Sequence, residues 1–381
     1  MRKPRTVLVI TGARSEYGYL KPVLRRLAKS KRLAAHLLVT GMHTQERYGH
    51  TLDEVKKDAL VPIATVVPIA EDDTMLEALA KEIAGIEAHC RMERPDLMLV
   101  IADRDEAFAG AIVAGHLGIP LAHMSGGDTS GYGVDEPIRH SISKFAHVHF
   151  TWTPTNAKRL RALGEEAWRI HVTGSTAFDA LRTAKVAVRA VVAARYGLDA
   201  DKLWVLVVQH PTPLDTVPLE KQLAPTLAAV AGLDAETIIL YPNSDTGSEQ
   251  FISRIERMRG TPHVQIFESL PHEDYMALLS QASLLVGNSS SGILESGYFK
   301  IPTIDIGGRQ KGRECGKNVI QVPYEKEAIE RALKRALSPA FLRLAKSSKH
   351  PYDRGDASGK IVEVLEKLPL DERLAYKKIA L

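Results

Sequence analysis

The sequence predicts an α/β protein with two doubly wound domains, in which helices cover both faces of a parallel β-sheet. Its 381 residues exceed what one hydrophobic core usually fills and indicate two domains of roughly 150–200 residues. Short, nearly continuous apolar runs alternate with segments of helical periodicity, as expected for strands that are buried on both faces. The alternation pauses at an alanine-rich stretch, residues 184–202, and then begins again. We therefore expect one domain on each side of this stretch.

Apolar runs bounded by polar or glycine-rich segments predict the strands, and the segments between them predict the helices. In the first half, strands are expected at residues 6–10, 34–40, 62–67, 96–101, 120–123 and 147–151, with helices near 20–30, 52–58, 74–92, 106–116 and 138–146. In the second half, strands are expected at residues 204–209, 237–241, 264–267, 284–286, 302–306 and 319–322, with helices near 219–231, 247–257, 273–280, 292–298 and 325–337.

A final helix is expected at residues 360–368, just before Pro369. In proteins with two such domains a tail helix often crosses back to the first one. The N-terminal domain is thus expected to comprise residues 1–183, completed by 356–381, and the C-terminal domain residues 184–355. Because open parallel sheets bind ligands beyond the carboxyl ends of their strands, we expect the active site in a cleft between the domains.

Composition excludes several classes of protein. A hydrophobic content of 45% and a charged content of 25% are those of a soluble globular protein. The net charge of +4 is small and the basic residues are scattered, so no nucleic-acid partner is expected. No apolar run approaches the roughly 20 residues of a membrane-spanning helix, and no signal peptide precedes the first strand. Cys90 and Cys315 lie far apart without metal-ligand spacing, which favours a reduced, cytoplasmic protein, and no membrane partner is expected.

Polar residues follow two strands of the first domain at their carboxyl ends. The first strand leads into a glycine turn that carries Arg14, a fair phosphate contact, although an ordinary surface arginine fits equally well. The strand at 96–101 is followed by Asp103 and Arg104, which should face the mouth of the cleft. For the next two residues, Asp105 and Glu106, we favour a structural role at the N-terminus of the following helix.

The segment DEPIRHSISK, residues 135–144, begins another helix that carries several ionisable side chains. Pro137 suits the first helical turn and puts Asp135 and Glu136 at the positive end of the helix dipole. Arg139 lies four residues after Asp135, and His140 lies four residues after Glu136, so each pair shares a helical face. Such a group could transfer protons, and the alternative is a helix with ion pairs on the protein surface.

In the second domain, the stretch from residue 284 to 313 predicts an anion-binding site. A strand, a Gly/Ser-rich loop and a helix N-terminus present free backbone N–H groups to a ligand. Ser289 and Ser290 add hydroxyl donors, and Glu295 in the first helical turn could accept hydrogen bonds from ribose hydroxyls. Arg309 and the basic residues after it favour a phosphate ligand. An ordinary N-capped helix is the alternative.

Two other strand ends of the second domain are polar. His210 follows the strand at 204–209, where a buried structural histidine is as plausible as a functional one. Asn243 and Asp245 follow the strand at 237–241 and would suit the hydroxyl groups of a nucleotide. The sequence contains no dinucleotide-binding GxGxxG pattern, phosphate-binding P-loop, zinc-binding HExxH or nucleophile elbow.

Taken together, these motifs resemble one family of enzymes. TGARSEYGYLKP (11–22), ADRDE (102–106), DEPIRHSISK (135–144), QHP (209–211), GNSSSGILE (287–295) and IGGRQKGRE (306–314) occur in the order found in that family. The family is that of the hydrolysing UDP-N-acetylglucosamine 2-epimerases of sialic-acid and legionaminic-acid biosynthesis, and the resemblance extends from residue 6 to about 365.

This resemblance implies the glycosyltransferase-B architecture of two Rossmann-like domains. It also implies a reaction: UDP-N-acetylglucosamine, or a 2,4-diacetamido-6-deoxy analogue, would be converted to the free 2-epimer and UDP. The family is thought to eliminate UDP to form a glycal and then to add water. The expected partners are the UDP-sugar substrate, the UDP product and further copies of the chain in a dimer or tetramer. No metal and no other cofactor is implied.

The resemblance assigns roles to residues at matching positions. Acid/base or sugar-contacting roles are implied for Asp103, Asp135, Glu136, Arg139, His140 and His210. Substrate or nucleotide contacts are expected from Arg14, Arg104, Ser125, Asn243, Asp245, Ser289, Ser290, Glu295 and Arg309.

The chain departs from the family pattern at two positions. Ala102 occupies a turn position that is often glycine, which is a mild change. Ser125 stands before Gly126-Gly127, where a glutamate or histidine is common, and serine is a poor base without an activating neighbour. We hypothesise that Asp128 supplies the missing carboxylate. A non-hydrolysing 2-epimerase, a glycosyltransferase on the same fold and a non-catalytic nucleotide-sugar sensor are the competing interpretations.

Overall fold

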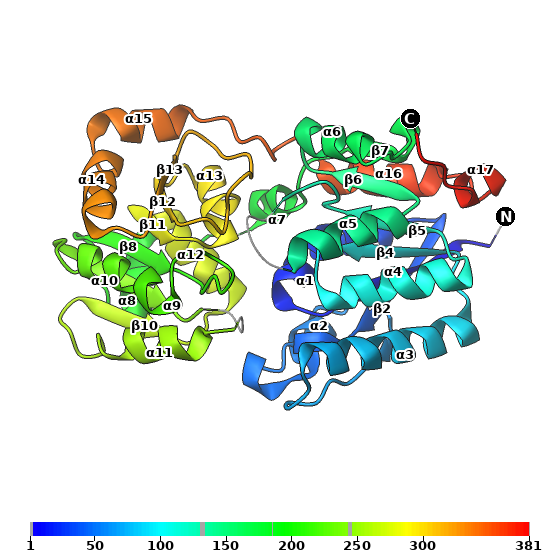
Figure 1. Ribbon diagram of the computed structural model, residues 1–381, viewed down its shortest axis with the longest axis horizontal. Helices are drawn as coiled ribbons and strands as arrows, with labels where there is room; N and C mark the ends of the chain where they lie inside the picture. Colours follow the sequence, from blue (N-terminus) through cyan, green and yellow to red (C-terminus); the bar gives the residue numbers. More distant parts are fainter. Residues whose placement is uncertain (1–2, 130–133, 185, 243–245, 381) are drawn as a thin grey trace. The chain divides into compact units, whose positions relative to one another are not determined.

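The computed structural model describes residues 3–129, 134–184, 186–242 and 246–380, and the chain divides into two compact units (Figure 1). Unit 1 contains the described residues of Met1–Asp128, Val134–Arg182 and Tyr352–Leu381. Unit 2 contains those of Thr183–Pro351, together with Thr129.

In the described part of unit 1, seven strands form a parallel sheet in the order β3-β2-β1-β4-β5-β6-β7. The strands are β1 (Arg5–Thr11), β2 (Leu33–Val39), β3 (Ile63–Val66), β4 (Leu97–Ile101), β5 (Leu121–Met124), β6 (Val148–Thr151) and β7 (Ile170–Val172). The helices are α1 (Arg14–Leu27), α2 (Leu52–Asp58), α3 (Met75–Glu93), α4 (Asp105–Leu117), α5 (Asp135–Phe145), α6 (Pro154–Ala162), α7 (Ala177–Thr183), α16 (Ala357–Lys367) and α17 (Glu372–Ala375), with short 3-10 helices η1 (Gly41–Thr44), η2 (Glu46–Tyr48) and η3 (Ala167–Arg169).

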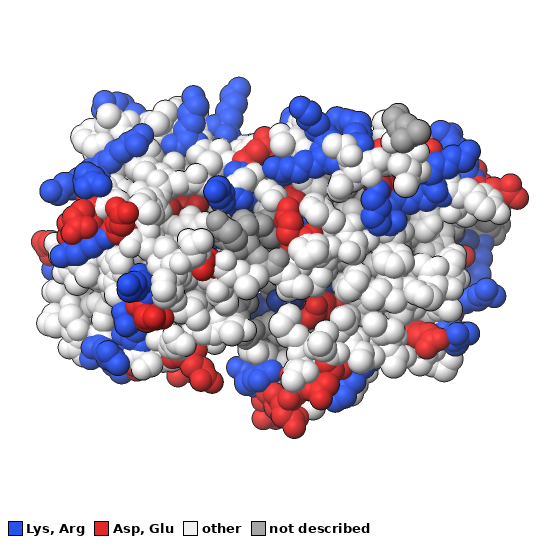
Figure 2. Space-filling view, viewed as in Figure 1, with Lys and Arg blue, Asp and Glu red and all other residues white. Residues whose placement is uncertain are grey.

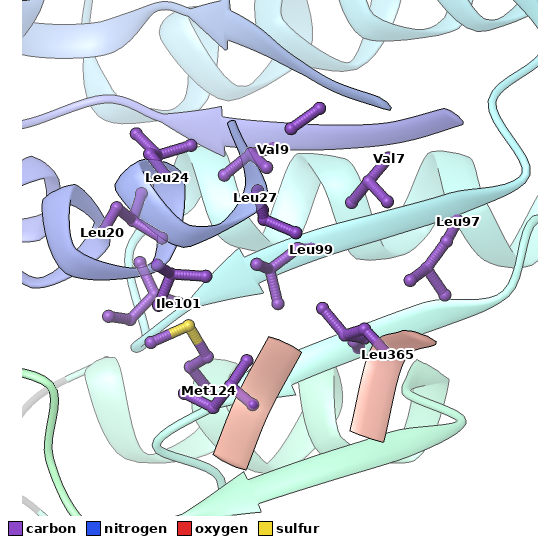
Figure 3. Close-up of a cluster of buried hydrophobic side chains, with 14 of the residues drawn as sticks. Val7, Val9, Leu20, Leu24, Leu27, Leu97, Leu99, Ile101, Met124 and Leu365 are labelled. Atoms are coloured by element: carbon purple, nitrogen blue, oxygen red, sulfur yellow. The ribbon is translucent and has the colours of Figure 1, made fainter. Parts of the chain in front are cut away.

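Both faces of this sheet are apolar because alternate residues of each strand point to opposite sides. Val7 and Val9 of β1 pack with α1 and α16 on one face, and Figure 3 shows Leu20, Leu24 and Leu365 from these helices in that cluster. The opposite face, which includes residues 8 and 10 of the same strand, packs against α3, α4 and α5. The strands are therefore buried on both sides, as their continuous hydrophobicity predicts.

The C-terminal segment completes unit 1. Leu365 of α16 is fully buried in the core. The guanidinium group of Arg5, at the start of β1, donates hydrogen bonds to the carbonyl oxygens of Leu365, Glu366 and Leu368 at 2.8, 2.7 and 2.5 Å. The C-terminal end of α16 is thus attached to β1, the first strand of the chain.

In the described part of unit 2, six strands form a second parallel sheet in the order β10-β9-β8-β11-β12-β13. The strands are β8 (Leu203–Val208), β9 (Ala235–Leu240), β10 (Val264–Phe267), β11 (Leu284–Gly287), β12 (Thr303–Ile306) and β13 (Val319–Val322). The helices are α8 (Arg189–Tyr196), α9 (Leu219–Gln222), α10 (Ala224–Val230), α11 (Ser248–Glu256), α12 (His272–Gln281), α13 (Glu295–Phe299), α14 (Lys326–Ala336) and α15 (Pro339–Ser347), with the 3-10 helix η4 (Ser290–Gly292). Hydrophobic clusters on both faces of the sheet again supply the core.

The predicted fold class, two doubly wound α/β domains, is confirmed. The prediction missed β7, because its three residues are only partly buried and form no apolar run. Three predicted helices need correction. α1 begins at Arg14, six residues earlier than expected, and includes Pro22. The helix expected at 219–231 is divided into α9 and α10. The helix expected at 292–298 is the five-residue α13.

The surface in Figure 2 carries basic and acidic side chains intermixed, and on this face the basic ones form no continuous stripe. None of the helices in the described part of the chain is long and apolar enough to cross a membrane.

Candidate active site

Three neighbouring strands of unit 1, β1, β4 and β5, end beside one another and are followed by predicted site residues. Arg14 is the first residue of α1, after β1. Asp103 and Arg104 lie between β4 and α4, and Arg104 is the N-cap residue of α4. Ser125 and Asp128 follow β5. The order of the strands thus brings residues from distant parts of the sequence to one edge of the sheet.

Arg139 is the centre of a charged network at this edge. Its side chain is only 2% exposed, and its guanidinium group forms ion pairs with Asp103 and, at 3.0 Å, with Glu136 Oε2. The other oxygen of Glu136 lies 3.4 Å from His140 Nε2. Because a buried arginine requires charged partners, this network holds two carboxylates and an imidazole in a defined arrangement.

The sequence of α5 explains why Arg139 points inward. Ile138 and Ile142 are buried on the apolar side of the helix, and the buried Arg139 lies beside them. Asp135 and Glu136 occupy the first turn, as predicted. The interpretation of this segment as a surface helix with exposed ion pairs is therefore wrong for Arg139, which joins α5 to the end of β4.

Two residues at this edge adopt left-handed backbone conformations that favour glycine. Ala102, after β4, has φ +65°, and Ser125, after β5, has φ +70°. Each such conformation costs a non-glycine residue on the order of 1–2 kcal/mol, and strain of this kind is common at functional sites. Ala102 directly precedes Asp103 after β4, and Ser125 directly precedes the Gly126-Gly127 turn after β5.

Asp128 is 1% exposed and lies against α6 and the C-terminal segment. Its Oδ1 accepts hydrogen bonds from Asn156 Nδ2 at 3.3 Å and from the Tyr352 hydroxyl at 3.4 Å. Its backbone N–H donates to the Ser125 carbonyl at 3.3 Å. Ser125, and Asp128, which we hypothesise to supply the carboxylate missing at Ser125, thus belong to one tight and buried turn.

A pair of buried carboxyl groups lies beneath the loops after β1 and β4. Glu16 and Glu106 are 4% and 3% exposed, and the two side chains lie close enough to affect each other's ionisation. Burial, and then the neighbouring Glu106, raise the pKa of Glu16 well above its usual value. Burial alone would raise the pKa of Glu106, but the Arg104 guanidinium and the hydrogen bond from Glu16 bring it below its usual value. The two carboxyl groups are thus shifted in opposite directions, with Glu16 favouring its protonated form.

The side chain of Glu106 also binds Arg104 and restricts the residue type at position 12. Arg104 Nε donates to its Oε1 at 2.9 Å. A Cβ on Gly12 would lie 2.2 Å from the same oxygen, so only glycine fits at the start of the loop that leads to Arg14. Glu106 lies in the first turn of α4, as predicted, and in addition forms an ion pair with Arg104. Its proximity to Glu16, 90 residues earlier in the chain, could not be predicted from the sequence.

Two further carboxyl groups nearby have perturbed ionisation. Burial, and then Glu106, raise the pKa of Glu82 to about 9; this side chain accepts a hydrogen bond from Thr40 Oγ1 at 3.2 Å. Burial, then Glu106 and, to a smaller extent, Asp135 raise the pKa of Asp105 to about 6, while Arg104 opposes the rise. Perturbed carboxyl groups gathered at one sheet edge are typical of acid/base sites. The structural role that we favoured for Asp105 overlooked this environment.

In unit 2, the neighbouring strands β8, β11 and β12 bring a second set of predicted residues together. His210 follows β8, Ser289 and Ser290 follow β11, and Arg309 follows β12. The loops after β8 and β12 both hydrogen-bond to Asn288, the residue before the serines. Asn243 and Asp245 lie outside the described residues.

The serine loop is organised by hydroxyl groups. Ser289 caps η4: its Oγ accepts hydrogen bonds from the backbone N–H and the hydroxyl of Ser291 at 3.3 and 3.0 Å. The Tyr275 hydroxyl shares a hydrogen bond with Ser291 Oγ. Glu295, 7% exposed, is the first residue of α13. Because α13 has five residues, its dipole contributes less to anion binding than the longer predicted helix would, and hydroxyl and backbone donors carry more of that role.

Among the described residues, no cluster of three or more His, Cys, Asp or Glu side chains could hold a metal ion.

Comparison with known proteins agrees with the motifs. The family model described as UDP-N-acetylglucosamine 2-epimerase matches residues 25–366. The UDP-N,N'-diacetylbacillosamine 2-epimerase (hydrolyzing) of Legionella pneumophila is 33% identical over 377 residues, which cover 98% of each chain. The UDP-N-acetylglucosamine 2-epimerase of Neisseria meningitidis serogroup B is 32% identical over 334 residues, or 88% of each chain.

Solved structures show the same fold. The crystal structure of a Neisseria meningitidis UDP-GlcNAc 2-epimerase, bound to UDP-GlcNAc, aligns with a TM-score of 0.83 at 19% identity and covers 95% of this chain and all of that one. The family resemblance that the motifs carry is confirmed by the family model and by the relatives above 30% identity. This chain therefore belongs to the UDP-N-acetylglucosamine 2-epimerase family.

Proposed function

We propose that this protein is a hydrolysing nucleotide-sugar 2-epimerase. Its substrate would be UDP-N-acetylglucosamine or a 2,4-diacetamido-6-deoxy analogue, and its products the free 2-epimeric sugar and UDP. The observation that carries the proposal is the network in which buried Arg139 joins Asp103, Glu136 and His140 at the edge of the first sheet. The Legionella pneumophila relative, whose name specifies a hydrolysing 2-epimerase, supports the hydrolytic outcome.

The reaction needs a base, an acid and a stabilised leaving group. In the first step a carboxylate takes the proton from C2, the C1–O bond breaks, and UDP departs with the bonding electrons to leave a C1=C2 double bond. In the second step water adds its oxygen to C1, and a proton enters C2 from the opposite face. The C2 proton is only weakly acidic, so both proton positions must be well defined.

The side chains of unit 1 are suited to these proton transfers. Asp103 is held by the Arg139 guanidinium group and remains 16% exposed, so its carboxyl group is accessible to a substrate. Glu136 and His140 form a pair through which a proton can pass. Asp135 shares the first turn of α5 with Glu136. We assign the acid/base roles to these residues and, on the opposite face of C2, to Asp128.

Leaving-group stabilisation requires cations and hydrogen-bond donors near the pyrophosphate. Arg14 and Arg104 in unit 1 and Arg309 in unit 2 supply the cations, while Ser289 and Ser290 supply hydroxyl groups. In this proposal Glu295 binds the ribose and His210 acts near the reacting sugar.

Proton NMR in D2O tests this function directly. With UDP-N-acetylglucosamine as substrate, we expect release of N-acetylmannosamine that carries deuterium at C2, since the proton returned to C2 comes from solvent. A UDP-linked epimer would instead identify a non-hydrolysing 2-epimerase. Saturable binding without turnover would identify a nucleotide-sugar sensor.

A second experiment identifies the sugar and the nucleotide of the substrate. A panel of UDP- and GDP-linked acetamido sugars, with and without substituents at C4 and a hydroxyl at C6, should be screened for nucleotide release. We expect the highest kcat/KM with a UDP-linked 2-acetamido sugar.

The role of Asp128 can be tested separately. Asp128→Asn keeps the shape of the side chain in its buried turn but removes its basicity, so turnover should be abolished while UDP binding, measured by calorimetry, is retained. An active Asp128→Asn enzyme would exclude Asp128 as the substitute for the residue missing at Ser125.

A further inference from the structure

Asn288, the residue that follows β11, connects three strand ends of unit 2. It is fully buried, and its backbone N–H donates to the Val208 carbonyl at the end of β8 at 3.2 Å. Its backbone carbonyl accepts hydrogen bonds from Gln310 Nε2 at 2.8 Å and from Arg309 Nη1 at 3.2 Å, both from the loop after β12. One residue thus contacts the loops that carry His210, the serines and Arg309.

The side-chain amide of Asn288 holds the backbone of His210 from both sides. Asn288 Oδ1 accepts from the His210 N–H at 2.7 Å, and Asn288 Nδ2 donates to the His210 carbonyl at 2.9 Å. Nδ2 also lies 3.5 Å from Thr212 Oγ1. Because a carboxamide has the same donor and acceptor as a peptide group, it continues the pairing of β8 with β11 past the last backbone pair, Val208 with Gly287.

Gly287 makes this contact possible. Its φ is +136°, and a Cβ at this position would lie 2.1 Å from the Val208 carbonyl oxygen. The backbone of β11 can therefore approach the end of β8 closely, which brings the short side chain of Asn288 within hydrogen-bonding distance of His210.

We propose that Asn288 is a positioning residue that orients His210 relative to the serine loop. This inference rests on the proposed function, in which His210 acts near the sugar and Ser289 and Ser290 bind the nucleotide. Alanine at position 288 removes both bonds to His210. Aspartate keeps the acceptor for the His210 N–H but places an oxygen against the His210 carbonyl, which repels it.

A double-mutant cycle tests this role in the full-length protein. We expect Asn288→Ala to lower kcat on the order of 10- to 100-fold, the loss typical of a misplaced catalytic group. If Asn288 acts through His210, Asn288→Ala should lower kcat no further in a His210→Ala background.

Asn318 provides a matched control. It is also a fully buried asparagine of unit 2, and its Nδ2 donates to Ser296 Oγ at 3.1 Å and to the Ile301 carbonyl at 2.8 Å. Asn318→Ala should lower Tm as much as Asn288→Ala does, with kcat within about threefold of wild type. Equal kcat values for the two variants, or independent effects of Asn288→Ala and His210→Ala, would overturn the proposal.

A readout that needs no turnover separates this proposal from the proposed function. The imidazole signals of His210, assigned in a 13C–1H spectrum by comparison with His210→Gln, should shift in Asn288→Ala and stay in place in Asn318→Ala. Unchanged signals in Asn288→Ala would contradict the positioning role even if the wild-type protein released no nucleotide. Where Asn288→Ala does not fold, Asn288→Asp serves in the same measurements.

Discussion

The carboxyl edges of the two sheets differ in the groups that organise them. In unit 1, ion pairs and carboxyl groups with shifted pKa values surround Arg104 and Arg139. In unit 2, the network around Asn288 and the serine loop consists mainly of amides and hydroxyl groups. The buried carboxyl group of Asp305 on β12 also favours its neutral form, because burial raises its pKa to about 7.

The two edges also differ in the residues that adopt positive φ angles. Unit 1 places Ala102 and Ser125 in left-handed conformations after β4 and β5. Unit 2 places glycines, Gly287 and Gly307, in the positive-φ positions at the ends of β11 and β12. The same architecture thus supports one edge rich in ion pairs and backbone strain, and a second edge where glycines take the positive-φ positions and amide and hydroxyl groups form most of the network.

The largest effect is expected at the charged edge. Asp103→Asn should lower kcat by about 10³-fold, because an amide cannot take the C2 proton, while the Kd for UDP changes less than about threefold. Turnover measured by nucleotide release and UDP binding measured by calorimetry check this result. Retained turnover, or lost UDP binding with intact chemistry, would remove the basis for assigning catalysis to unit 1.

The second effect concerns stability and pH. Glu82 is 1% exposed, and its folded-state pKa of about 9 exceeds the usual value of 4.5. The folded protein therefore holds a proton that the unfolded chain has lost, and stability falls as pH rises through this window. Glu82→Gln stays neutral in both states, so it should be more stable than wild type by about 2–3 kcal/mol near pH 7.

Urea unfolding at several pH values measures this difference, which should be smallest near pH 5 and grow toward about pH 8. Glu87→Gln is the control, since Glu87 lies on the same helix but is 44% exposed and paired with Arg91. If the difference in the free energy of unfolding between Glu82→Gln and wild type does not change with pH, Glu82 is ionised in the folded protein.

At the carboxyl edge of the sheet in unit 2 the expected effect is on binding. Ser290→Ala should raise the Kd for UDP by about tenfold, the loss of one charge-assisted hydrogen bond, with kcat within a factor of about three. Calorimetric titration with UDP and steady-state kinetics separate the two quantities. A fall in kcat without a change in the Kd would assign Ser290 to the chemistry instead.

The smallest effect tests the strain in unit 1. Ala102→Gly should stabilise the protein by about 1 kcal/mol, because glycine adopts φ +65° without a steric cost. Ala88→Gly, on the exposed side of α3, should destabilise it by about 1 kcal/mol. Calorimetric Tm values should move in opposite directions. A lower Tm for Ala102→Gly would show that this turn is not strained.

Much of this architecture could be predicted because buried parallel strands have a continuous apolar pattern. The runs at β8, β10 and β13 were predicted within one residue of their observed bounds. The short edge strand β7 and the early start of α1 could not be predicted, since neither carries a periodic apolar signal of its own.

The site could be predicted in part. The polar residues at strand ends were found, because strand order places them at one edge whatever their partners are. The contacts themselves depend on tertiary packing: the burial of Arg139, the proximity of the buried carboxyl groups of Glu16 and Glu106, and the bidentate contact of Asn288 with His210. Sequence spacing within one helix suggested partners for Arg139 but could not indicate Asp103 on another element.

The attachment of α16 to β1 has a consequence for synthesis. Unit 2 is built mainly from the continuous segment Thr183–Pro351, so its sheet and helices are available before the end of the chain has been translated. Unit 1 lacks α16 until residues 357–367 leave the ribosome, and until then the apolar face that α16 covers, including Val7 and Leu97, remains exposed. The first domain to be synthesised is therefore the last to be completed, and nascent chains that stall before α16 are the expected clients of chaperones.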